Sequence, residues 1–322
     1  MTAIRTVDYH TGGEPFRIVV GGAEIPGGAT ILDRRRDALE RLDHVRRLLV
    51  NEPRGHADMY GCHVVPPNDE GADLGVVFFH NAGYSTACGH GTIALVTWAL
   101  DEGIVDRIEG DNRVVVDVPS GRLETVATVR DGRVRSVRFR NVPAFVWATG
   151  VDVGGLIADV AYGGAFYASV PEIVEPSELP RLVALAREIK HGLEIRHEIV
   201  HPLEPELRDI YGVIFWQEEG RDPLTQRNVT VFADGEVDRS PCGSGTSARL
   251  ALLHASGQLP RGAELRHLSI VGSSFTGSVV DEADVAGRAA VVTEVTGSAY
   301  RTGESSFTLD PDDPFREGFL LR

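Results

Sequence analysis

The stretch Cys88-Gly-His-Gly-Thr92 occurs a second time in the chain, as Cys242-Gly-Ser-Gly-Thr246. Each copy is followed by an apolar stretch of helix-forming residues, which ends at Gly103 in the first copy and at Gly257 in the second. Because glycine commonly terminates a helix, this pattern predicts two helices of equal length that each begin beside a cysteine. A chain built from two similar halves would carry such a repeat.

The start of a helix favours a reactive thiol. It carries about half an elementary positive charge and unpaired N–H groups, which lower a cysteine pKa toward neutrality and can hold a carboxylate. Two such helix ends that face each other would form an anion clamp with a thiol on each side. Moving the α-proton of an amino acid needs a base on one face and an acid on the other, and a thiolate and a thiol can exchange these roles. This chemistry predicts neither a metal nor an organic cofactor.

The composition is that of an ordinary globular protein with two domains. The chain has 322 residues, of which 42% are hydrophobic, and its formal net charge is −15. Such a charge repels phosphate backbones and anionic membranes, so we expect no nucleic-acid and no membrane partner. The sequence has no apolar run of about 18 residues and no signal pattern, which predicts a cytoplasmic protein.

Lysine and cysteine usage disfavours two common kinds of catalysis. Lys190 is the only lysine and is expected to be an exposed cation at a helix end, so a Schiff base with pyridoxal phosphate has a single poor candidate. The three cysteines form no C-x-x-C pair, and no H-E-x-x-H motif occurs, which argues against a zinc site. Cys62 lies in a strand-like run and is expected to be a small buried hydrophobe.

The chain resembles the proline racemase superfamily of cofactor-independent amino-acid racemases, epimerases and dehydratases over nearly its whole length. The resemblance rests on the two C-G-x-G-T copies and on three further motifs, Asp8-Tyr-His-Thr-Gly-Gly-Glu-Pro15, Glu52-Pro-Arg-Gly-His-Ala-Asp-Met-Tyr-Gly61 and Ala161-Tyr-Gly-Gly-Ala-Phe-Tyr-Ala168, together with Asp238-Arg-Ser-Pro241 before the second cysteine.

The resemblance implies an α+β fold of two pseudo-symmetric halves. In each half a curved, barrel-like β-sheet would surround a central α-helix, as in diaminopimelate epimerase. We expect residues 1–140 with 306–322 to form the first half, which carries Cys88. Residues 141–305 would form the second half, which carries Cys242.

The local sequence pattern agrees with that architecture. The stretches 93–100 and 248–255 are apolar on most faces, as helices enclosed by a sheet would be. An amphipathic helix is predicted over Arg34–Val50, with Leu39, Leu42, Val45 and Leu49 on one face. Strands are predicted for the runs 16–20, 74–79, 114–118, 229–233 and 289–295.

Residue roles follow from the motifs of the resemblance. Cys88 and Cys242 would be the catalytic pair that donates and accepts the proton. His90 and Asp238 would hold the ring nitrogen of the substrate, although a first-turn hydrogen bond and a helix-capping or turn role are the respective structural alternatives. Thr11 and Glu14 are further candidates to line the pocket. The substrate carboxylate would be bound by the backbone N–H groups of Gly89, His90, Gly243 and Ser244.

Two activities within this superfamily compete. The motifs Glu52–Gly61 and Ala161–Ala168 and the ending 312–322 resemble the trans-3-hydroxy-L-proline dehydratases, which typically carry threonine where this chain has Cys242. A second thiol is what racemisation requires, so we favour a racemase or 2-epimerase of proline or a hydroxyproline. The dehydratase is the runner-up. By the same resemblance, 4-hydroxyproline epimerases usually carry a histidine at the position that we match to Tyr211, which weakens the case for a 4-hydroxyl substrate.

A third alternative is a non-catalytic protein that binds an amino acid, which would have no need of two thiols. The expected partner is in every case a small imino acid. Whether the chain forms a homodimer is left open.

Overall fold

A computed structural model describes residues 3–321. Met1, Thr2 and Arg322, which the expected domain bounds include, lie outside the described residues. The chain divides into two compact units. Unit 1 comprises Met1–Val137 and Ser298–Arg322, and unit 2 comprises Arg138–Gly297. Strand β8 (Arg133–Arg140) runs across the change from unit 1 to unit 2.

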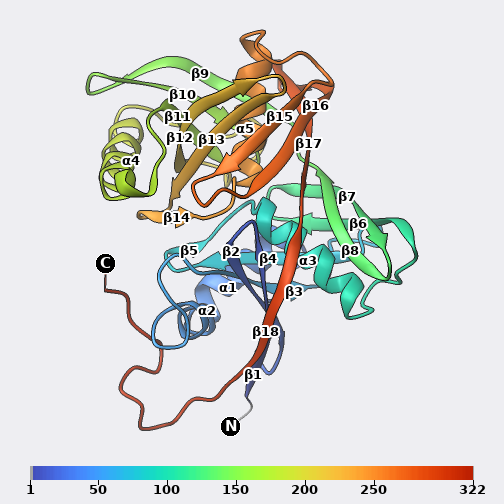
Figure 1. Cartoon of the computed structure of the whole chain (residues 1–322). Helices are drawn as coiled ribbons and strands as arrows, with labels where there is room; N and C mark the ends of the chain where they lie inside the picture. The colour runs from blue at the N-terminus through green and yellow to red at the C-terminus, as the bar shows by residue number, and fades with distance from the viewer. Residues whose placement is uncertain (1–2, 322) are drawn as a thin grey trace. The chain divides into compact units, whose positions relative to one another are not determined.

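Unit 1 is a mixed β-sheet with helices inserted between its strands (Figure 1). Neighbouring strands follow the order β18–β1–β2–β3–β4–β6–β7, in which β2–β3 and β4–β6 are parallel and the other pairs antiparallel. Its elements are β1 (Ile4–Thr11), β2 (Glu14–Gly21), α1 (Ile31–Arg41), α2 (Asp43–Val50), β3 (Tyr60–Val65), β4 (Leu74–His80), β5 (Gly83–Tyr84), α3 (Gly89–Asp101), β6 (Gly110–Val118), β7 (Gly121–Arg130) and β18 (Ala299–Phe307).

Unit 2 repeats this arrangement and closes it into a barrel. The strands follow the order β9–β10–β11–β12–β13–β15–β16–β17, and β17 pairs back onto β9. Its elements are β9 (Ala144–Val153), β10 (Leu156–Tyr162), β11 (Phe166–Pro171), η1 (Pro176–Glu178), α4 (Leu179–Glu194), β12 (Ile210–Arg221), β13 (Leu224–Phe232), β14 (Glu236–Asp238), α5 (Gly243–Ala255), β15 (Glu264–Ser269), β16 (Ser274–Val285) and β17 (Arg288–Gly297).

The two units share one topology. An antiparallel hairpin, β1–β2 or β10–β11, is followed by helices and then by a parallel pairing, β2–β3 or β11–β12. The central helix of each unit follows a short strand, β5 or β14, and leads into a strand that again pairs parallel. This agreement confirms the predicted α+β fold with two pseudo-symmetric halves.

The central helices are enclosed by their sheets, as predicted. Every residue of α3 except Asp101 is buried, and α5 is buried from Gly243 through Leu253. Figure 1 shows α5 among the strands of unit 2 and α4 outside them. Since a helix surrounded by a sheet has no solvent face, its sequence is apolar nearly all round.

The predictions for the first helical region were wrong in two respects. The helix expected over Arg34–Val50 is broken at Leu42, where the backbone leaves the helical region (φ −114°, ψ 10°) between α1 and α2. Leu39, expected on the buried face, is 53% exposed, because α1 turns Ile31, Arg34 and Ala38 inward instead.

Lys190 is likewise not an exposed cation. It is half-buried near the end of α4, and its Nζ donates a hydrogen bond to the carbonyl of Ala233 at 2.9 Å.

Candidate active site

Cys88 caps the N-terminus of α3 from an extended conformation (φ −152°, ψ 96°). Its Sγ accepts a hydrogen bond from the backbone N–H of Gly91 at 3.3 Å, and the His90 ring nitrogens Nε2 and Nδ1 lie 3.4 and 3.6 Å from it. The side chain is 5% exposed. We call Cys88, Gly89, His90 and Gly91 the Cys88 site, in which a thiol and an imidazole meet at the start of a helix.

His90 is held in a buried aromatic surrounding. Its ring meets the rings of Tyr60 and Phe16 edge-on, with centroids 4.9 and 5.8 Å away, and its carbonyl accepts a hydrogen bond from Thr11 Oγ1 at 2.9 Å. Burial lowers the pKa of His90 to about 3. The imidazole is therefore neutral at physiological pH and can accept a hydrogen bond from a cationic amine.

The β1–β2 hairpin carries Thr11 to this position. Gly12 and Gly13 occupy its turn with φ of 61° and 94°. A two-residue hairpin with positive φ at both central positions is the turn for which paired glycines are preferred. Glu14, which follows the turn, is fully buried in β2.

Cys242 begins α5 in a different conformation, with a left-handed backbone (φ 62°, ψ 105°) that is costly for any residue other than glycine. Its Sγ lies 3.8 Å from Tyr167 Oη and 4.0 Å from Ser244 Oγ, and these two oxygens are 2.7 Å apart. Its backbone N–H donates to Ser240 Oγ at 3.1 Å. The side chain is 6% exposed. We call Asp238, Ser240, Cys242, Gly243 and Ser244, with Tyr167, the Cys242 site.

Asp238 is a buried carboxyl beside this thiol. Its Oδ1 accepts a hydrogen bond from the Ser240 backbone N–H at 2.7 Å. Burial raises the pKa of Asp238 to about 6, an effect that the hydrogen bonds from Ser240 only partly offset. A buried carboxyl with this affinity for a proton is suited to receive a cationic nitrogen, which would stabilise its charged form.

The expected lowering of the thiol pKa is not what the structure shows for Cys242. Burial, followed by the charge of Asp238, raises the pKa of Cys242 to about 12, whereas the Gly245 N–H and the hydroxyls of Thr230 and Tyr167 lower it by less. Loss of hydration outweighs the helix N-terminus here. The ligand-free Cys242 side chain is therefore a thiol, and a bound cation that neutralises Asp238 would remove one cause of the high pKa.

The second glycine of each C-G-x-G motif lies against the sulfur. A Cβ placed on Gly91 would come within 2.6 Å of Cys88 Sγ and 2.4 Å of the Phe16 ring. A Cβ on Gly245 would come within 2.9 Å of Cys242 Sγ. Since real Cβ contacts are longer than this, both positions require glycine if the thiol is to keep its place.

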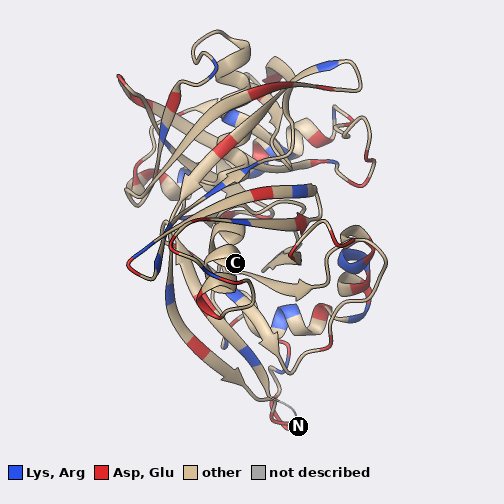
Figure 2. Cartoon of the chain, turned by 90° about the vertical axis from the view of Figure 1, so that its right-hand side faces the viewer, with Lys and Arg blue, Asp and Glu red and all other residues tan. Residues whose placement is uncertain are grey.

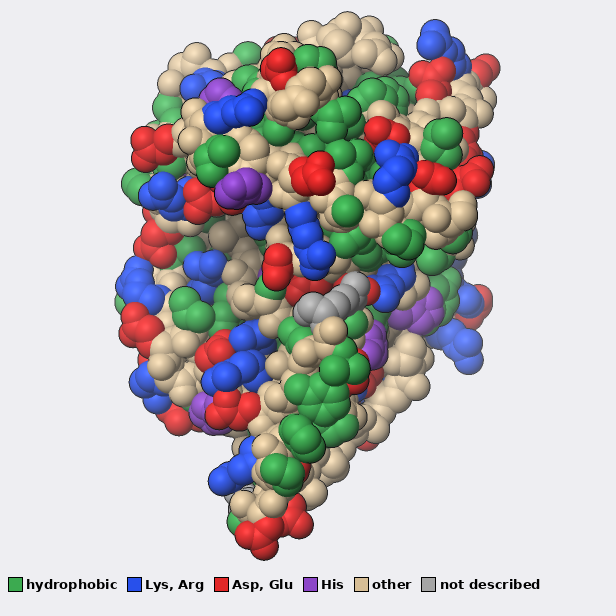
Figure 3. Space-filling view, turned by 90° about the vertical axis from the view of Figure 1, so that its left-hand side faces the viewer, with side chains coloured by type: hydrophobic (Ala, Val, Ile, Leu, Met, Phe, Trp, Pro, Cys, Tyr) green, Lys and Arg blue, Asp and Glu red, His purple; other side chains and the backbone are tan. Residues whose placement is uncertain are grey.

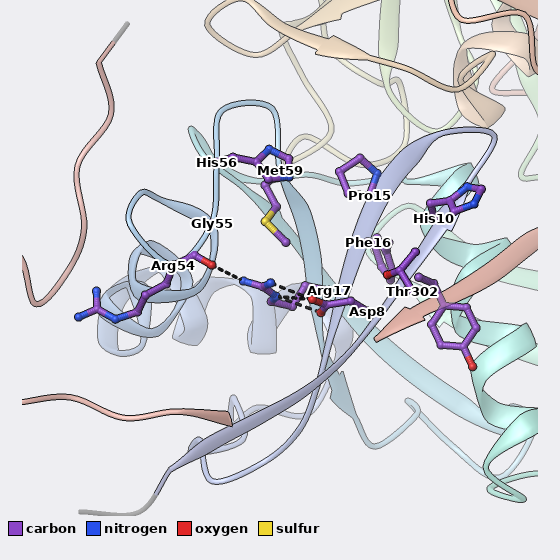
Figure 4. A pocket seen from close by; sticks show the side chains of 11 residues that line it. Asp8, His10, Pro15, Phe16, Arg17, Arg54, Gly55, His56, Met59 and Thr302 are labelled. Atoms are coloured by element: carbon purple, nitrogen blue, oxygen red, sulfur yellow. Dashed lines mark hydrogen bonds and ion pairs between the residues drawn. The ribbon is translucent and has the colours of Figure 1, made fainter. Parts of the chain in front are cut away.

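Two of the sequence motifs meet at an ion pair in unit 1. The Arg17 guanidinium binds the Asp8 carboxylate with Nε–Oδ1 and Nη2–Oδ2 distances of 3.0 and 2.8 Å, and its Nη1 donates to the carbonyls of Leu49 and Arg54. Figure 4 shows this arrangement in a cavity of about 230 Å³ that Phe16, Met59 and His56 also line. Every guanidinium nitrogen is thus engaged within the protein, which indicates that the ion pair fixes the loop after α2.

The C-terminal segment supports the same loop. Phe319 pairs with Glu52 as an isolated bridge, and Asp313 accepts from Arg54 Nη2 at 2.5 Å. Figure 3 views the face that carries this segment and shows hydrophobic side chains gathered there, with Phe315, Leu320 and Leu321 among the exposed ones.

The residues expected in the site fall into two groups. Within unit 1 the structure brings Cys88, Gly89 and His90 together, and within unit 2 it brings together Asp238, Cys242, Gly243 and Ser244. Sequence reasoning missed Tyr167, although it lies in the motif Ala161–Ala168, and missed Ser240. Cys62 is fully buried in β3, as expected.

We also searched the part of the chain that the structure describes for a metal site and for a membrane-spanning helix. In residues 3–321 no three His, Cys, Asp or Glu side chains gather in a way that could hold a metal ion. Within the same range, no helix has the length and apolar character needed to cross a membrane. Figure 2 shows acidic and basic residues interspersed in both units.

The fold and the repeated helix-capping cysteine define a class of α+β proteins with two similar halves. The chain belongs to the proline racemase family, whose model matches residues 6–320. It is an enzyme of that family, which contains both isomerases and lyases.

Named relatives of different activities are about equally similar to this chain. It is 43% identical to a trans-3-hydroxy-L-proline dehydratase of Bacillus cereus, over 98% of this chain and 97% of the relative. It is 44% identical to a 3-hydroxyproline 2-epimerase of Burkholderia multivorans, over 99% and 98%. Among solved structures, a hydroxyproline epimerase from Agrobacterium vitis with bound trans-4-hydroxy-L-proline matches with a TM-score of 0.92 and 32% identity, over 99% of this chain and 96% of that one.

Proposed function

We propose that this protein is a cofactor-independent racemase or 2-epimerase of proline or a hydroxyproline. The observation that carries the proposal is that each unit begins its central helix with a cysteine, in Cys88 and in Cys242. Inversion at a carbon that bears an acidic proton needs one group to remove the proton and a second to deliver one to the opposite face. Two thiols supply both groups, whereas a dehydratase needs only one base at this carbon.

The groups around each thiol fit an imino acid. The carboxylate would be bound by the N–H groups of Gly89 and His90 at one helix start and of Gly243 and Ser244 at the other. The ring nitrogen, cationic in the substrate, would be held by the Asp238 carboxylate and the neutral His90 imidazole. Holding the carboxylate at positive helix ends stabilises the charge that develops when the α-proton leaves.

Proton exchange with solvent tests the reaction type. The enzyme is incubated in deuterated water with L-proline, trans-3-hydroxy-L-proline and trans-4-hydroxy-L-proline, and the products are followed by NMR. The proposal expects the 2-epimer of at least one substrate, with deuterium at Cα. Formation of pyrroline-2-carboxylate from trans-3-hydroxy-L-proline without any epimer would instead establish the dehydratase, in which loss of the α-proton is followed by loss of the 3-hydroxyl.

Cysteine variants test the residue roles. Cys88→Ser and Cys242→Ser should each lower kcat for epimerisation by about 10²–10⁴-fold, the range typical of a lost general acid or base. Cys62→Ser is the matched control, since that thiol is fully buried in β3 and does not cap either central helix. Full epimerase activity in either of the first two variants would contradict the two-thiol proposal.

Cys242→Thr separates the two activities within one scaffold. If Cys88 alone can still remove the α-proton, this variant should exchange that proton for deuterium without inversion. With trans-3-hydroxy-L-proline it should release pyrroline-2-carboxylate. A variant that neither exchanges nor dehydrates would show that Cys242 itself is the base for the L-isomer.

A further inference from the structure

Tyr167 is a buried phenol that the two-thiol chemistry does not by itself require. It lies on β11 and is 1% exposed. Its Oη is 2.7 Å from Ser244 Oγ and 3.8 Å from Cys242 Sγ. The ring meets Tyr211 edge-on, with centroids 5.8 Å apart, and packs in one hydrophobic cluster with Ile214 and Ala248. The hydroxyl is thus held beside the sulfur by a ring that has little freedom to move.

The number of hydrogens on Cys242 determines which atom donates in its hydrogen bond with Tyr167. When Cys242 is a thiol, its S–H donates to Tyr167 Oη, so the phenol hydrogen is free to point to Ser244 Oγ. When Cys242 is a thiolate, it has no hydrogen to give and can only accept. The phenol hydrogen must then turn to the sulfur, and the Ser244 hydroxyl can donate to Tyr167 in return.

We propose that Tyr167 is a positioning residue for Cys242, whose hydrogen bonds with Cys242 and Ser244 reverse direction each time the sulfur changes between acid and base. No covalent bond is broken in the reversal, because both hydroxyls only rotate about their C–O bonds. The inference rests on the proposed function, since only a thiol that serves as both acid and base needs a partner suited to both forms.

The titratable groups around Cys242 differ from Tyr167 in what they do at the sulfur. Burial raises the pKa of Tyr167 well above that of a free phenol, so the hydroxyl keeps its hydrogen and acts as a donor. Asp238 on β14 faces the same sulfur but is an acceptor when ionised, and its charge disfavours the thiolate. Arg239 and Tyr211 are the other titratable groups nearby, and they act on Asp238 and on Tyr167 rather than on the sulfur. The Gly245 N–H and the Thr230 hydroxyl also lower the pKa of Cys242, each by more than the hydrogen bond from Tyr167 does.

Alkylation by iodoacetamide tests this without any turnover. The thiolate displaces iodide to form a thioether, and peptide mass spectrometry separates Cys242 from Cys62 and Cys88. Tyr167→Phe removes the donor and should shift the ionisation of Cys242 upward by about one pH unit. The fraction of Cys242 present as thiolate then falls about tenfold at a fixed pH, while the more basic thiolate is roughly threefold more nucleophilic. The alkylation of Cys242 should therefore be about threefold slower. The rate at Cys88 in the same sample should not change.

Two variants make the result specific. Tyr162→Phe deletes another buried hydroxyl of unit 2 and should leave the rate at Cys242 unchanged. Ser244→Ala keeps the phenol and frees its hydrogen for the sulfur, so Cys242 should react as fast as in the parent protein or faster. Better reagent access in Tyr167→Phe would raise the rate, which is opposite in sign to the expected effect.

An unchanged or faster rate at Cys242 in Tyr167→Phe overturns the proposal. The proposal is also overturned if Cys242 in Ser244→Ala is alkylated about as slowly as expected for Tyr167→Phe. Should Tyr167→Phe fail to fold, the Ser244→Ala measurement alone provides the test. Failure of the proposed function would appear elsewhere, as absent α-proton exchange in the parent protein, and would leave the alkylation result readable.

Discussion

At the scale of single residues, the two cysteines occupy matching positions but do not have matching surroundings. Cys88 is extended and lies beside an imidazole, whereas Cys242 is left-handed and lies beside two hydroxyls and a carboxyl. A substrate with one cationic nitrogen and two unlike faces also lacks symmetry. Divergence of the two sites after duplication is therefore what a single asymmetric substrate would favour.

We expect the charged Asp238 carboxylate to lower the stability of the folded protein while it helps to bind the substrate. Its raised pKa means that the folded protein disfavours the charged carboxyl, so the stability it contributes is present below about pH 4 and is lost as the pH rises through about 6. Asp238→Asn removes the buried charge while its amide oxygen can still accept from Ser240. Above pH 6 we expect the free energy of unfolding to rise by on the order of 2 kcal/mol, together with a large increase in KM.

Urea unfolding of this variant at about pH 7.5 and pH 4 provides the check, since the gain should vanish at the lower pH. The exposed Asp234→Asn is the matched control, with no expected change at either pH. A variant that loses stability at the higher pH would show that the charged carboxyl has a compensating partner in unit 2.

At the scale of elements, the packing of the helix starts can be tested by adding one methyl group. Alanine normally suits a helix better than glycine, but Gly91→Ala would drive Cβ against the Phe16 ring and Cys88 Sγ. We expect a loss of about 1–3 kcal/mol in the free energy of unfolding. Gly245→Ala meets its neighbours at 2.9–3.2 Å and should cost less stability, while still displacing the thiol and lowering activity.

Gly303→Ala is the control for both glycine variants. It lies in β18, and a Cβ there would meet nothing within 4 Å. Thermal unfolding and kcat should match the parent protein. If Gly91→Ala were as stable and as active as Gly303→Ala, the close approach of glycine to the thiol would not be a requirement of the motif.

Elements with regular hydrophobic patterns could be predicted from the sequence. Apolar residues on nearly all faces indicated burial in three segments, the helices over 93–100 and 248–255 and the strand over 74–79. The indication holds because each segment is enclosed by other parts of its unit. The strand expected over 229–233 was only the end of β13, which starts at Leu224 among polar residues. Ala233 itself has left the strand, with φ 48°.

Features set by neighbours distant in the chain could not be predicted. The break at Leu42 reflects how α1 and α2 each meet the sheet, which no local periodicity records. The pKa of Cys242 depends on its burial and on Asp238, and the contact with Tyr167 joins residues far apart in sequence. The motif indicated a thiol at a helix start, but its protonation state is a property of the folded unit.

At the scale of the whole molecule, the repeated topology does not imply equal response to acid. Burial lowers the pKa of His63 to about 4 and of His90 to about 3, both in unit 1. Between about pH 4.5 and 5.5 the unfolded segment would bind two protons that the folded unit does not, so its stability falls by about 2.7 kcal/mol for each pH unit of acidification.

Unit 2 should be less sensitive over the same range. Burial lowers the pKa of His267 to about 3, so this histidine also favours unfolding in acid. Asp238, with a pKa raised to about 6, holds a proton when folded that it would release when unfolded, which has the opposite sign. The two effects nearly cancel, and partly buried His201 adds a smaller loss.

Acidification should therefore open unit 1 before unit 2. Amide hydrogen exchange, corrected for intrinsic rates and compared at about pH 7 and pH 5, should show protection falling in peptides of α3 while those of α5 change little. His63→Leu should remove about half of the loss in unit 1, because one of the two histidines there whose pKa is lowered by burial no longer titrates. The exposed His44→Gln should remove none. Earlier loss of protection in α5 would mean that the buried histidines of unit 1 gain protons without unfolding.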